Sequence, residues 1–159
     1  GLLISSIEDP NPVMYFEHKA LYRSVRENVS ENYSNIELGV ANMIRSGNEV
    51  SIISYGMGVH WAISTLEKLN YRDADLIDLR TLVPLDFEII KTSLKKTGKL
   101  IILQEDCHIG GFASHISSLI SEKCFELLDW LIFCYMLKSG LSFPCKIFLP
   151  HHDLLKFHI

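Results

Sequence analysis

The stretch VSIISYGMGVHWAISTLEKL, at residues 50–69, decides the fold of this chain. Its first part, Val50–Tyr55, is an apolar, β-branched run that ends at Gly56, as expected for a buried strand. Apolar residues then recur at helical spacing, at Val59, Ile63, Leu66 and Leu69. The stretch therefore predicts a strand followed directly by a helix.

The same strand and helix order repeats twice more along the chain. Ala74–Leu79 is a second buried run, and Asp86 and Gly98 bracket a predicted helix as its cap and its end. The apolar face of that helix consists of Phe87, Ile90 and Leu94. Lys99–Gln104 is a third strand, and the helix predicted after Gly110-Gly111 places these residues inward: Phe112, Ile116, Leu119, Cys124 and Leu127.

Strands that are apolar on both faces and are joined by helices predict a parallel sheet covered on both sides. The expected fold class is therefore α/β, with a three-layer α/β/α architecture and a mostly parallel sheet. Ligands or partners of such a sheet meet the carboxyl ends of its strands.

The region before this sheet has a different character. Residues 1–12 are an apolar helical end that runs into Asp9-Pro10-Asn11-Pro12, without an initiator Met, so we expect the chain to begin inside a fold. Val13–Glu17 resembles the last strand of another unit. The Asn, Ser and Glu content of the following residues predicts a linker that adds little core, with a boundary near residue 48.

Composition narrows the classes of function. The chain has 159 residues, 48% of them hydrophobic and 21% charged, and its net charge of −4 gives no electrostatic footprint for nucleic acid. Its cysteines (Cys107, Cys124, Cys134 and Cys145) contain no C-x-x-C pair, so neither disulfides nor structural zinc is expected. The longest apolar run, Trp130–Leu137, has eight residues, against about 20 for a membrane span. We expect a globular protein without nucleic-acid or membrane partners.

One candidate site follows the first strand. Gly56-Met57-Gly58, with Asp78 at the end of the next strand, partly matches a dinucleotide-binding fingerprint. Trp61 stands where the third glycine of the fingerprint belongs, and its bulk opposes close packing of helix and sheet. A tight turn is the preferred interpretation.

A second candidate follows the third strand. Glu105, Asp106, Cys107 and His108 lie at the predicted carboxyl edge. Adjacency in sequence does not make Cys107 and His108 a catalytic pair, so a loop that meets another domain or subunit is preferred. Gly110-Gly111 offers free amides for an anion, without further support.

Two further clusters carry oxygen or nitrogen donors. His151, His152 and Asp153 are adjacent near the end of the chain and are expected in a solvated tail rather than around a metal. Asp9 and Asn11, in a Pro-constrained loop, suit either a hard cation or an Asx-type turn, and the residues alone favour the turn.

Four segments, taken in order, resemble the beta subunit of the thiamine-diphosphate-dependent first component of 2-oxo acid dehydrogenase complexes. They are GLLISSIEDPNPVMYFEHKALYR (1–23), DLRTLVPLD (78–86), KKTGKLIILQED (95–106) and GGFASHISSLISEKCFELLD (110–129). Val59-His60 and the GGFAS stretch resemble the branched-chain (2-oxoisovalerate, or 3-methyl-2-oxobutanoate) type more than the pyruvate type.

This resemblance implies an organisation of the chain. Residues 1–27 would end the pyrimidine-binding domain, residues 28–48 would link, and residues 49–159 would form a transketolase C-terminal domain. The family's activating Glu and active-site His lie upstream of the position of Gly1, so no catalytic or cofactor-binding residue is assigned. The chain alone is expected to be inactive.

The resemblance also implies partners and cofactors. The whole enzyme would decarboxylate a 2-oxo acid on thiamine diphosphate with magnesium and acylate a lipoyl arm. Its beta subunit would contact an alpha subunit, a second beta subunit and the dihydrolipoyl acyltransferase core, in the bacterial cytoplasm or the mitochondrial matrix. The alternatives are a pyruvate dehydrogenase beta subunit, another transketolase-family enzyme, a nucleotide-binding oxidoreductase domain and a non-catalytic interaction module.

In relatives, a structural potassium ion is bound by the loop that matches Ser6, Asp9 and Asn11. The resemblance therefore turns the predicted turn into a candidate metal site.

Residues 130–147 depart from the family. FLPHH, at residues 148–152, resembles the family again. Either a reading-frame error or natural divergence explains the apolar, Cys-rich sequence of residues 130–147. Trp130–Leu137 is nevertheless a candidate for a substitute strand.

Overall fold

The computed structural model describes residues 1–26, 28, 34–107, 109–129, 132–136, 145–146 and 156–157. Its centre is a five-stranded sheet with the order β1-β3-β2-β4-β5. The strands of this sheet are β1 (Asn42–Arg45), β2 (Val50–Ser54), β3 (Ala74–Asp78), β4 (Leu100–Gln104) and β5 (Phe133–Met136). The helices are α1 (Leu2–Glu8), α2 (Leu21–Ser24), α3 (Met57–Lys68), α4 (Phe87–Thr97), α5 (Phe112–Lys123) and the 3₁₀ turn η1 (Phe125–Leu127). A separate pair consists of β6 (Cys145–Lys146) and β7 (Lys156–Phe157).

The sheet is mostly parallel, as predicted. β2 pairs in parallel with both β3 and β4, and β5 pairs in parallel with β4. Only β1 runs antiparallel, along the outer edge of β3. The helices α3, α4 and α5 lie in the connections between successive parallel strands, as expected for βαβ units.

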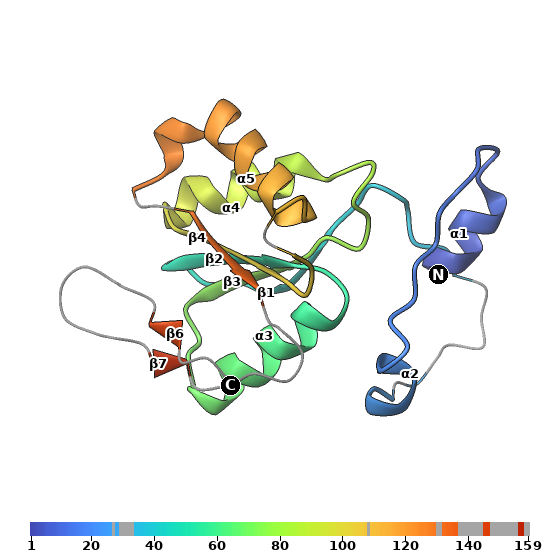
Figure 1. The fold of residues 1–159 in the computed structure, drawn as a ribbon, viewed down its shortest axis with the longest axis horizontal. Coiled ribbons are helices and arrows are strands. Elements are labelled where there is room, and N and C mark those ends of the chain that lie inside the picture. Colours follow the sequence, from blue (N-terminus) through green and yellow to red (C-terminus); the bar gives the residue numbers. More distant parts are fainter. Residues whose placement is uncertain are drawn as a thin grey trace.

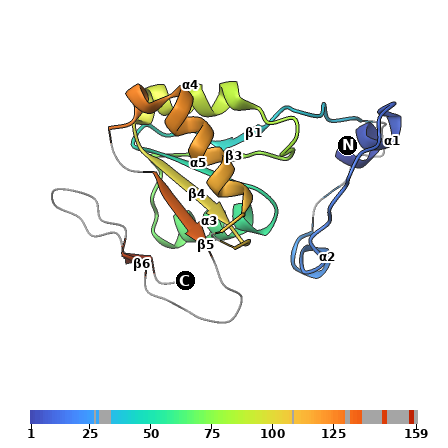
Figure 2. The same ribbon diagram turned by 45° about the horizontal axis from the view of Figure 1, so that its top comes forward.

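Helices cover both faces of the sheet, which confirms the three-layer architecture. In Figures 1 and 2, α4 and α5 lie on one face and α3 lies on the other. Adjacent residues of β2 point to opposite faces: Ile53 belongs to the core beneath α4 and α5, and Ile52 to the core beneath α3. This alternation explains why the strands carry apolar residues on both faces.

The helix α4 has the predicted ends. The Asp86 side chain accepts a hydrogen bond from the Ile89 N–H (3.3 Å), which satisfies a free amide of the first turn. Gly98 has a left-handed backbone (φ 63°), and its N–H is bonded to the Leu94 carbonyl. These two residues fix the length of the helix.

Three expectations about elements are corrected. Val13–Glu17, predicted as the last strand of another unit, is not in a strand and pairs with no strand among the described residues. The predicted linker contains β1, which joins the sheet, and Ala41 just before it is 8% exposed and part of the core. The last helix ends at Lys123, so Cys124 is its C-cap and Leu127 lies in η1.

β5 lies inside the stretch that departs from the resembled family. Phe133–Met136 pairs with β4 from Ile101 to Gln104, so the substitute strand proposed for Trp130–Leu137 forms over the part of it that is described. Across the described residues, no helix is long and apolar enough to cross a membrane.

The segment 1–26, with α1 and α2, lies beside the sheet rather than on either of its faces (Figures 1 and 2). No residue of α1 or α2 is buried. The segment is placed near the carboxyl ends of the strands, where Glu105 contacts it.

Candidate functional site

The loop that follows α1 is closed by its own hydrogen bonds. Asp9 Oδ1 accepts from the backbone N–H of Asn11 (2.8 Å) and from its side-chain Nδ2 (3.0 Å). Ser6 Oγ donates to the carbonyl of Leu2 (2.8 Å). This is the Asx-type turn that the residues alone favoured.

Ser6 of α1 and the loop after the helix together carry the oxygen atoms of the candidate cation site. Because the Asn11 amide nitrogen faces Asp9, the side-chain carbonyl oxygen is the acceptor that Asn11 has left. Lone pairs remain on Ser6 Oγ, which acts as a donor, and on the two-oxygen carboxylate of Asp9. Carboxylate, hydroxyl and amide oxygens are the donor types that hard cations prefer in proteins.

The turn between β2 and α3 is shaped by close packing. Gly56 has a positive φ (56°), and a Cβ on Gly58 would lie 2.3 Å from Ser54 Oγ and 3.3 Å from the Leu103 carbonyl. Gly58 therefore allows α3 to approach the sheet, which in a dinucleotide fingerprint is the task of the third glycine. The glycines serve a tight turn.

Asp78 lies beside that turn, because Asp78 pairs with Ser54 in the parallel register of β3 and β2. Its Oδ1 accepts from the backbone N–H of Arg80 (3.1 Å), a residue with a positive φ of 57°. Burial raises the pKa of the Asp78 carboxyl, although Arg80 and His60 oppose the rise. The carboxylate thus stabilises a strained loop start.

The loop after β4 is held by Gln104, whose side chain is 1% exposed. Gln104 Oε1 accepts from the Ala113 N–H (2.8 Å), and Nε2 donates to the Cys107 carbonyl (3.1 Å). Gly111 lies against both, since a Cβ there would be 2.1 Å from that carbonyl. Gln104 was not among the predicted site residues, although a Gln at the end of an apolar strand indicates a buried side chain that needs hydrogen-bond partners.

The predicted polar cluster of this loop is only partly brought together. Asp106 Oδ1 accepts from the N–H of Cys107 (2.7 Å), and Cys107 is exposed. Glu105 instead reaches the segment 1–26, where its Oε2 lies 2.7 Å from His18 Nε2. His108 and the cluster of His151, His152 and Asp153 lie outside the described residues.

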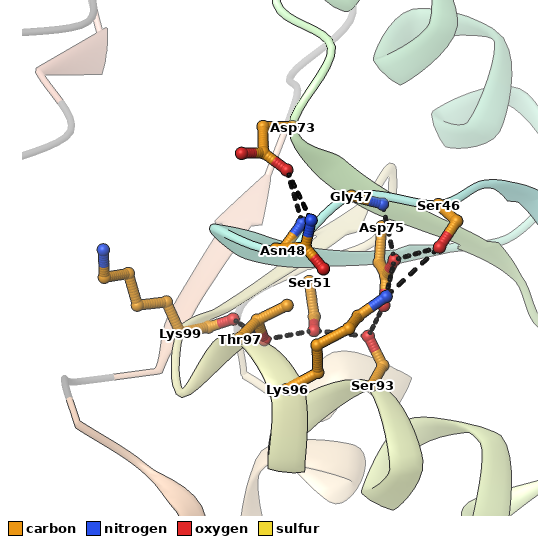
Figure 3. Close-up of polar contacts among 10 residues, drawn as sticks. All are labelled: Ser46, Gly47, Asn48, Ser51, Asp73, Asp75, Ser93, Lys96, Thr97 and Lys99. Atoms are coloured by element: carbon orange, nitrogen blue, oxygen red, sulfur yellow. Dashed lines mark hydrogen bonds and ion pairs between the residues drawn. The ribbon is translucent and has the colours of Figure 1, made fainter.

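A buried polar cluster at the opposite, amino edge was missed by sequence reasoning (Figure 3). Asp75 is fully buried, and its Oδ1 lies 2.7 Å from Lys96 Nζ and 2.8 Å from the N–H of Gly47. Ser93 Oγ donates to the other oxygen and also contacts Ser51 Oγ (2.5 Å). Ser51 and Asp75, polar residues within otherwise apolar strands, were the sequence features that could have indicated this cluster.

These contacts determine the protonation of Asp75. Burial alone would raise the pKa of this carboxyl, but hydrogen bonds from Lys96, Ser93 and Gly47 outweigh burial and hold the pKa below its ordinary value. A charged group satisfied on every side stabilises the fold rather than offering a reactive atom. Among the described residues, no three His, Cys, Asp or Glu side chains form a group that could hold a metal ion.

The fold and its edges together define a three-layer α/β domain whose buried polar side chains hold the sheet and its loops. Residues 39–132 match the family described as the transketolase C-terminal domain. The chain belongs to the transketolase C-terminal domain family.

Relatives of the chain are beta subunits of 2-oxo acid dehydrogenases. It is 42% identical over 136 residues to the mitochondrial 2-oxoisovalerate dehydrogenase subunit beta 2 of Arabidopsis thaliana, covering 81% of this chain and 37% of the relative. It is 40% identical over 131 residues to the pyruvate dehydrogenase E1 component subunit beta of Bacillus subtilis, covering 81% and 40%. The predicted resemblance is thus confirmed at the level of the beta subunit, while both substrate types are represented.

A solved structure supports the fold. A chain of a split-gene transketolase, an inactive beta4 tetramer, superposes with a TM-score of 0.59 at 23% identity, covering 72% of this chain and 37% of the other. This chain spans 37–40% of the length of the beta subunits quoted above.

Proposed function

We propose that this chain is the C-terminal part of the beta subunit of a branched-chain 2-oxo acid dehydrogenase, which decarboxylates 3-methyl-2-oxobutanoate and acylates a lipoyl arm. The observation that carries the proposal is the 37–42% identity to such beta subunits over 81% of the chain. A pyruvate dehydrogenase beta subunit is the alternative, because relatives of that type are 40% identical. The branched-chain preference rests on Val59-His60 and on Gly110–Ser114.

We assign to this part of the subunit a role in assembly. Its partners would be the alpha subunit, a second beta subunit and the dihydrolipoyl acyltransferase core. Two loops at the carboxyl edge expose apolar side chains, with Val83 86% and Ile109 93% exposed. Exposed apolar side chains at one edge of a sheet favour contact with another protein surface.

The division of the chain follows the same proposal. Residues 1–27 would complete the pyrimidine-binding domain, residues 28–48 would include the link, and residues 49–159 would continue the C-terminal domain. Support comes from the large apolar side chains that the first segment exposes: Leu3, Ile7, Val13, Met14, Tyr15, Phe16, Tyr22 and Val25. A segment with so little core of its own needs another surface to cover it.

The cofactors of the whole enzyme would be thiamine diphosphate and magnesium, held mainly by residues outside this chain. Thiamine diphosphate supplies a carbanion-stabilising centre when bound. Among the described residues, no three His, Cys, Asp or Glu side chains are grouped in a way that could hold magnesium. Potassium would be held by Ser6, Asp9 and Asn11, whose task is to fix the end of α1. The enzyme would work in the bacterial cytoplasm or the mitochondrial matrix.

The test is an assay of the complete subunit, produced together with its alpha subunit and supplied with thiamine diphosphate and magnesium. We expect a higher kcat/KM for 3-methyl-2-oxobutanoate than for pyruvate. A preference for pyruvate would move the assignment to the alternative subunit. If the assembled enzyme turns over neither 2-oxo acid, the proposed enzyme class is wrong.

A further inference from the structure

Contacts at Ser5 and at His18 join the segment 1–26 to other described parts of the chain. Ser5 Oγ donates to the Ile36 carbonyl (2.6 Å) and accepts from the Ile36 N–H (3.2 Å), so one hydroxyl holds both backbone groups of a residue that precedes β1. His18 Nε2 meets Glu105 Oε2 at 2.7 Å, directly after β4. The segment is therefore attached both to the run before β1 and to the carboxyl edge of the sheet.

The imidazole of His18 is docked rather than solvated. Its side chain is 30% exposed, and its Nδ1 is buried without a hydrogen-bond partner among the described residues. A neutral imidazole that donates from Nε2 to Glu105 keeps only an acceptor at Nδ1. Removing the carboxylate would leave neither ring nitrogen bonded, which a half-buried polar group tolerates poorly.

The other side of the contact is held firmly. Glu105 follows Gln104, whose buried side chain binds both the Ala113 N–H at the start of α5 and the Cys107 carbonyl. The backbone that follows Glu105 is thus held at Cys107 and again at Ala113. A contact with a fixed loop can orient the segment that reaches it.

We propose that His18 and Glu105 form an intramolecular latch that holds the segment 1–26 against the carboxyl edge of the sheet. The latch sets how the segment and the α/β domain are oriented, because the Ser5–Ile36 contact lies on the run before β1 and not on the body of the sheet. The partner of the edge is the segment of the same chain, not of a second copy. The latch does not depend on which 2-oxo acid the whole enzyme uses.

The latch is tested by exchanging the two side chains in the complete subunit. His18→Glu places two carboxylates together, and we expect roughly fivefold faster hydrogen exchange in residues 105–111, in line with the loss of one partly exposed pair. The double variant His18→Glu/Glu105→His should return the exchange rate toward that of the wild type. Lys19→Glu, on an exposed neighbouring residue, is the matched control and should leave the loop unchanged.

A cross-linking experiment decides between one chain and two. His18→Cys/Glu105→Cys is made in a Cys107→Ser background, because Cys107 is exposed and would compete. A short bismaleimide should give a product of monomer mass on a denaturing gel, in which mass spectrometry of the digested protein finds the peptides of residues 18 and 105 joined. A product of twice that mass, an absence of cross-linking, or unchanged exchange in His18→Glu would each overturn the latch.

Discussion

At the scale of single residues, Lys96 neutralises the buried charge at the amino edge of the sheet. Its Nζ lies 2.7 Å from Asp75 Oδ1, and Asp75 is fully buried. Lys96→Met leaves the carboxylate without its cation, and we expect a loss of about 2 kcal/mol, below the range of fully buried pairs because Lys96 is partly exposed. Thermal unfolding of the complete subunit measures the loss.

The control for this substitution is Lys95→Met. Lys95 is an exposed neighbour on the same helix, so the same change of charge and shape there should shift the midpoint little. An equal shift in both variants would show that Asp75 does not depend on Lys96.

The lowered pKa of Asp75 also predicts a dependence of stability on pH. A carboxyl whose pKa is lower in the folded state contributes stability above its unfolded pKa of about 3.9, and loses it as pH falls through the folded pKa. Asp75→Asn lacks this contribution. We therefore expect wild type and variant to differ most near neutral pH and to converge in acid. Denaturation measured between neutral pH and pH 3 tests the sign, and a gap that widens in acid would contradict it.

The candidate potassium site at Ser6, Asp9 and Asn11 predicts an effect of potassium on stability. If Asp9 holds potassium, the complete subunit should unfold at a higher temperature in potassium chloride than in a salt of a bulky organic cation at equal ionic strength. Asp9→Ala should remove that difference, while Glu17→Ala, a carboxylate in the same segment, should keep it. If the unfolding midpoint of the wild type is the same with and without potassium, the assignment of Ser6, Asp9 and Asn11 as potassium ligands is wrong.

At the scale of elements, Asp86 joins α4 to the run before β1. Oδ1 accepts from the Ile89 N–H, and Oδ2 accepts from the N–H of Ala41 (3.0 Å). Asp86→Ala should therefore lower the free energy of unfolding by about 2 kcal/mol. This is more than the loss of an N-cap alone, because the substitution also leaves the half-buried amide of Ala41 unpaired. Chemical denaturation of the complete subunit measures this cost.

Glu88→Ala is the matched control for Asp86→Ala, since Glu88 is an exposed acid in the first turn of the same helix. We expect a loss of a few tenths of a kcal/mol there, from the helix dipole alone. Similar losses in the two variants would show that the Ala41 contact contributes nothing.

Local patterns predicted the elements that carry their own signals. Asp86 and Gly98 marked the ends of α4, and the apolar runs marked three parallel strands. β1 was missed because it is a short edge strand with a bulge between Met43 and Arg45, so no alternating burial marks it. The strand predicted at Val13–Glu17 is absent because residues that favour a strand form one only when a second strand pairs with them.

At the scale of the whole molecule, the contacts that define the two polar edges come from distant parts of the sequence. Asp75 is satisfied by residues of α4 and of the turn before β2, and Glu105 by His18. The periodicity of apolar residues does not predict such long-range contacts, because they depend on strand order and on how far each loop extends. The carboxyl edge of the sheet was predicted to contact a partner. That His18 of the segment 1–26 contacts it could be learned only from the structure.

The last prediction concerns activity. We expect the 159-residue polypeptide, supplied with thiamine diphosphate and magnesium, to leave 3-methyl-2-oxobutanoate unchanged. The physical reason is that its buried polar groups are engaged within the fold: Gln104 holds a loop and Asp75 is neutralised by Lys96. A general acid or base must be able to reach a proton of the substrate, and neither group is placed to do so. Release of carbon dioxide is measured for this polypeptide and, as the positive control, for the complete subunit with its alpha partner. Turnover by the polypeptide alone would mean that the chemistry resides in this domain, and would replace the assembly role with a catalytic one.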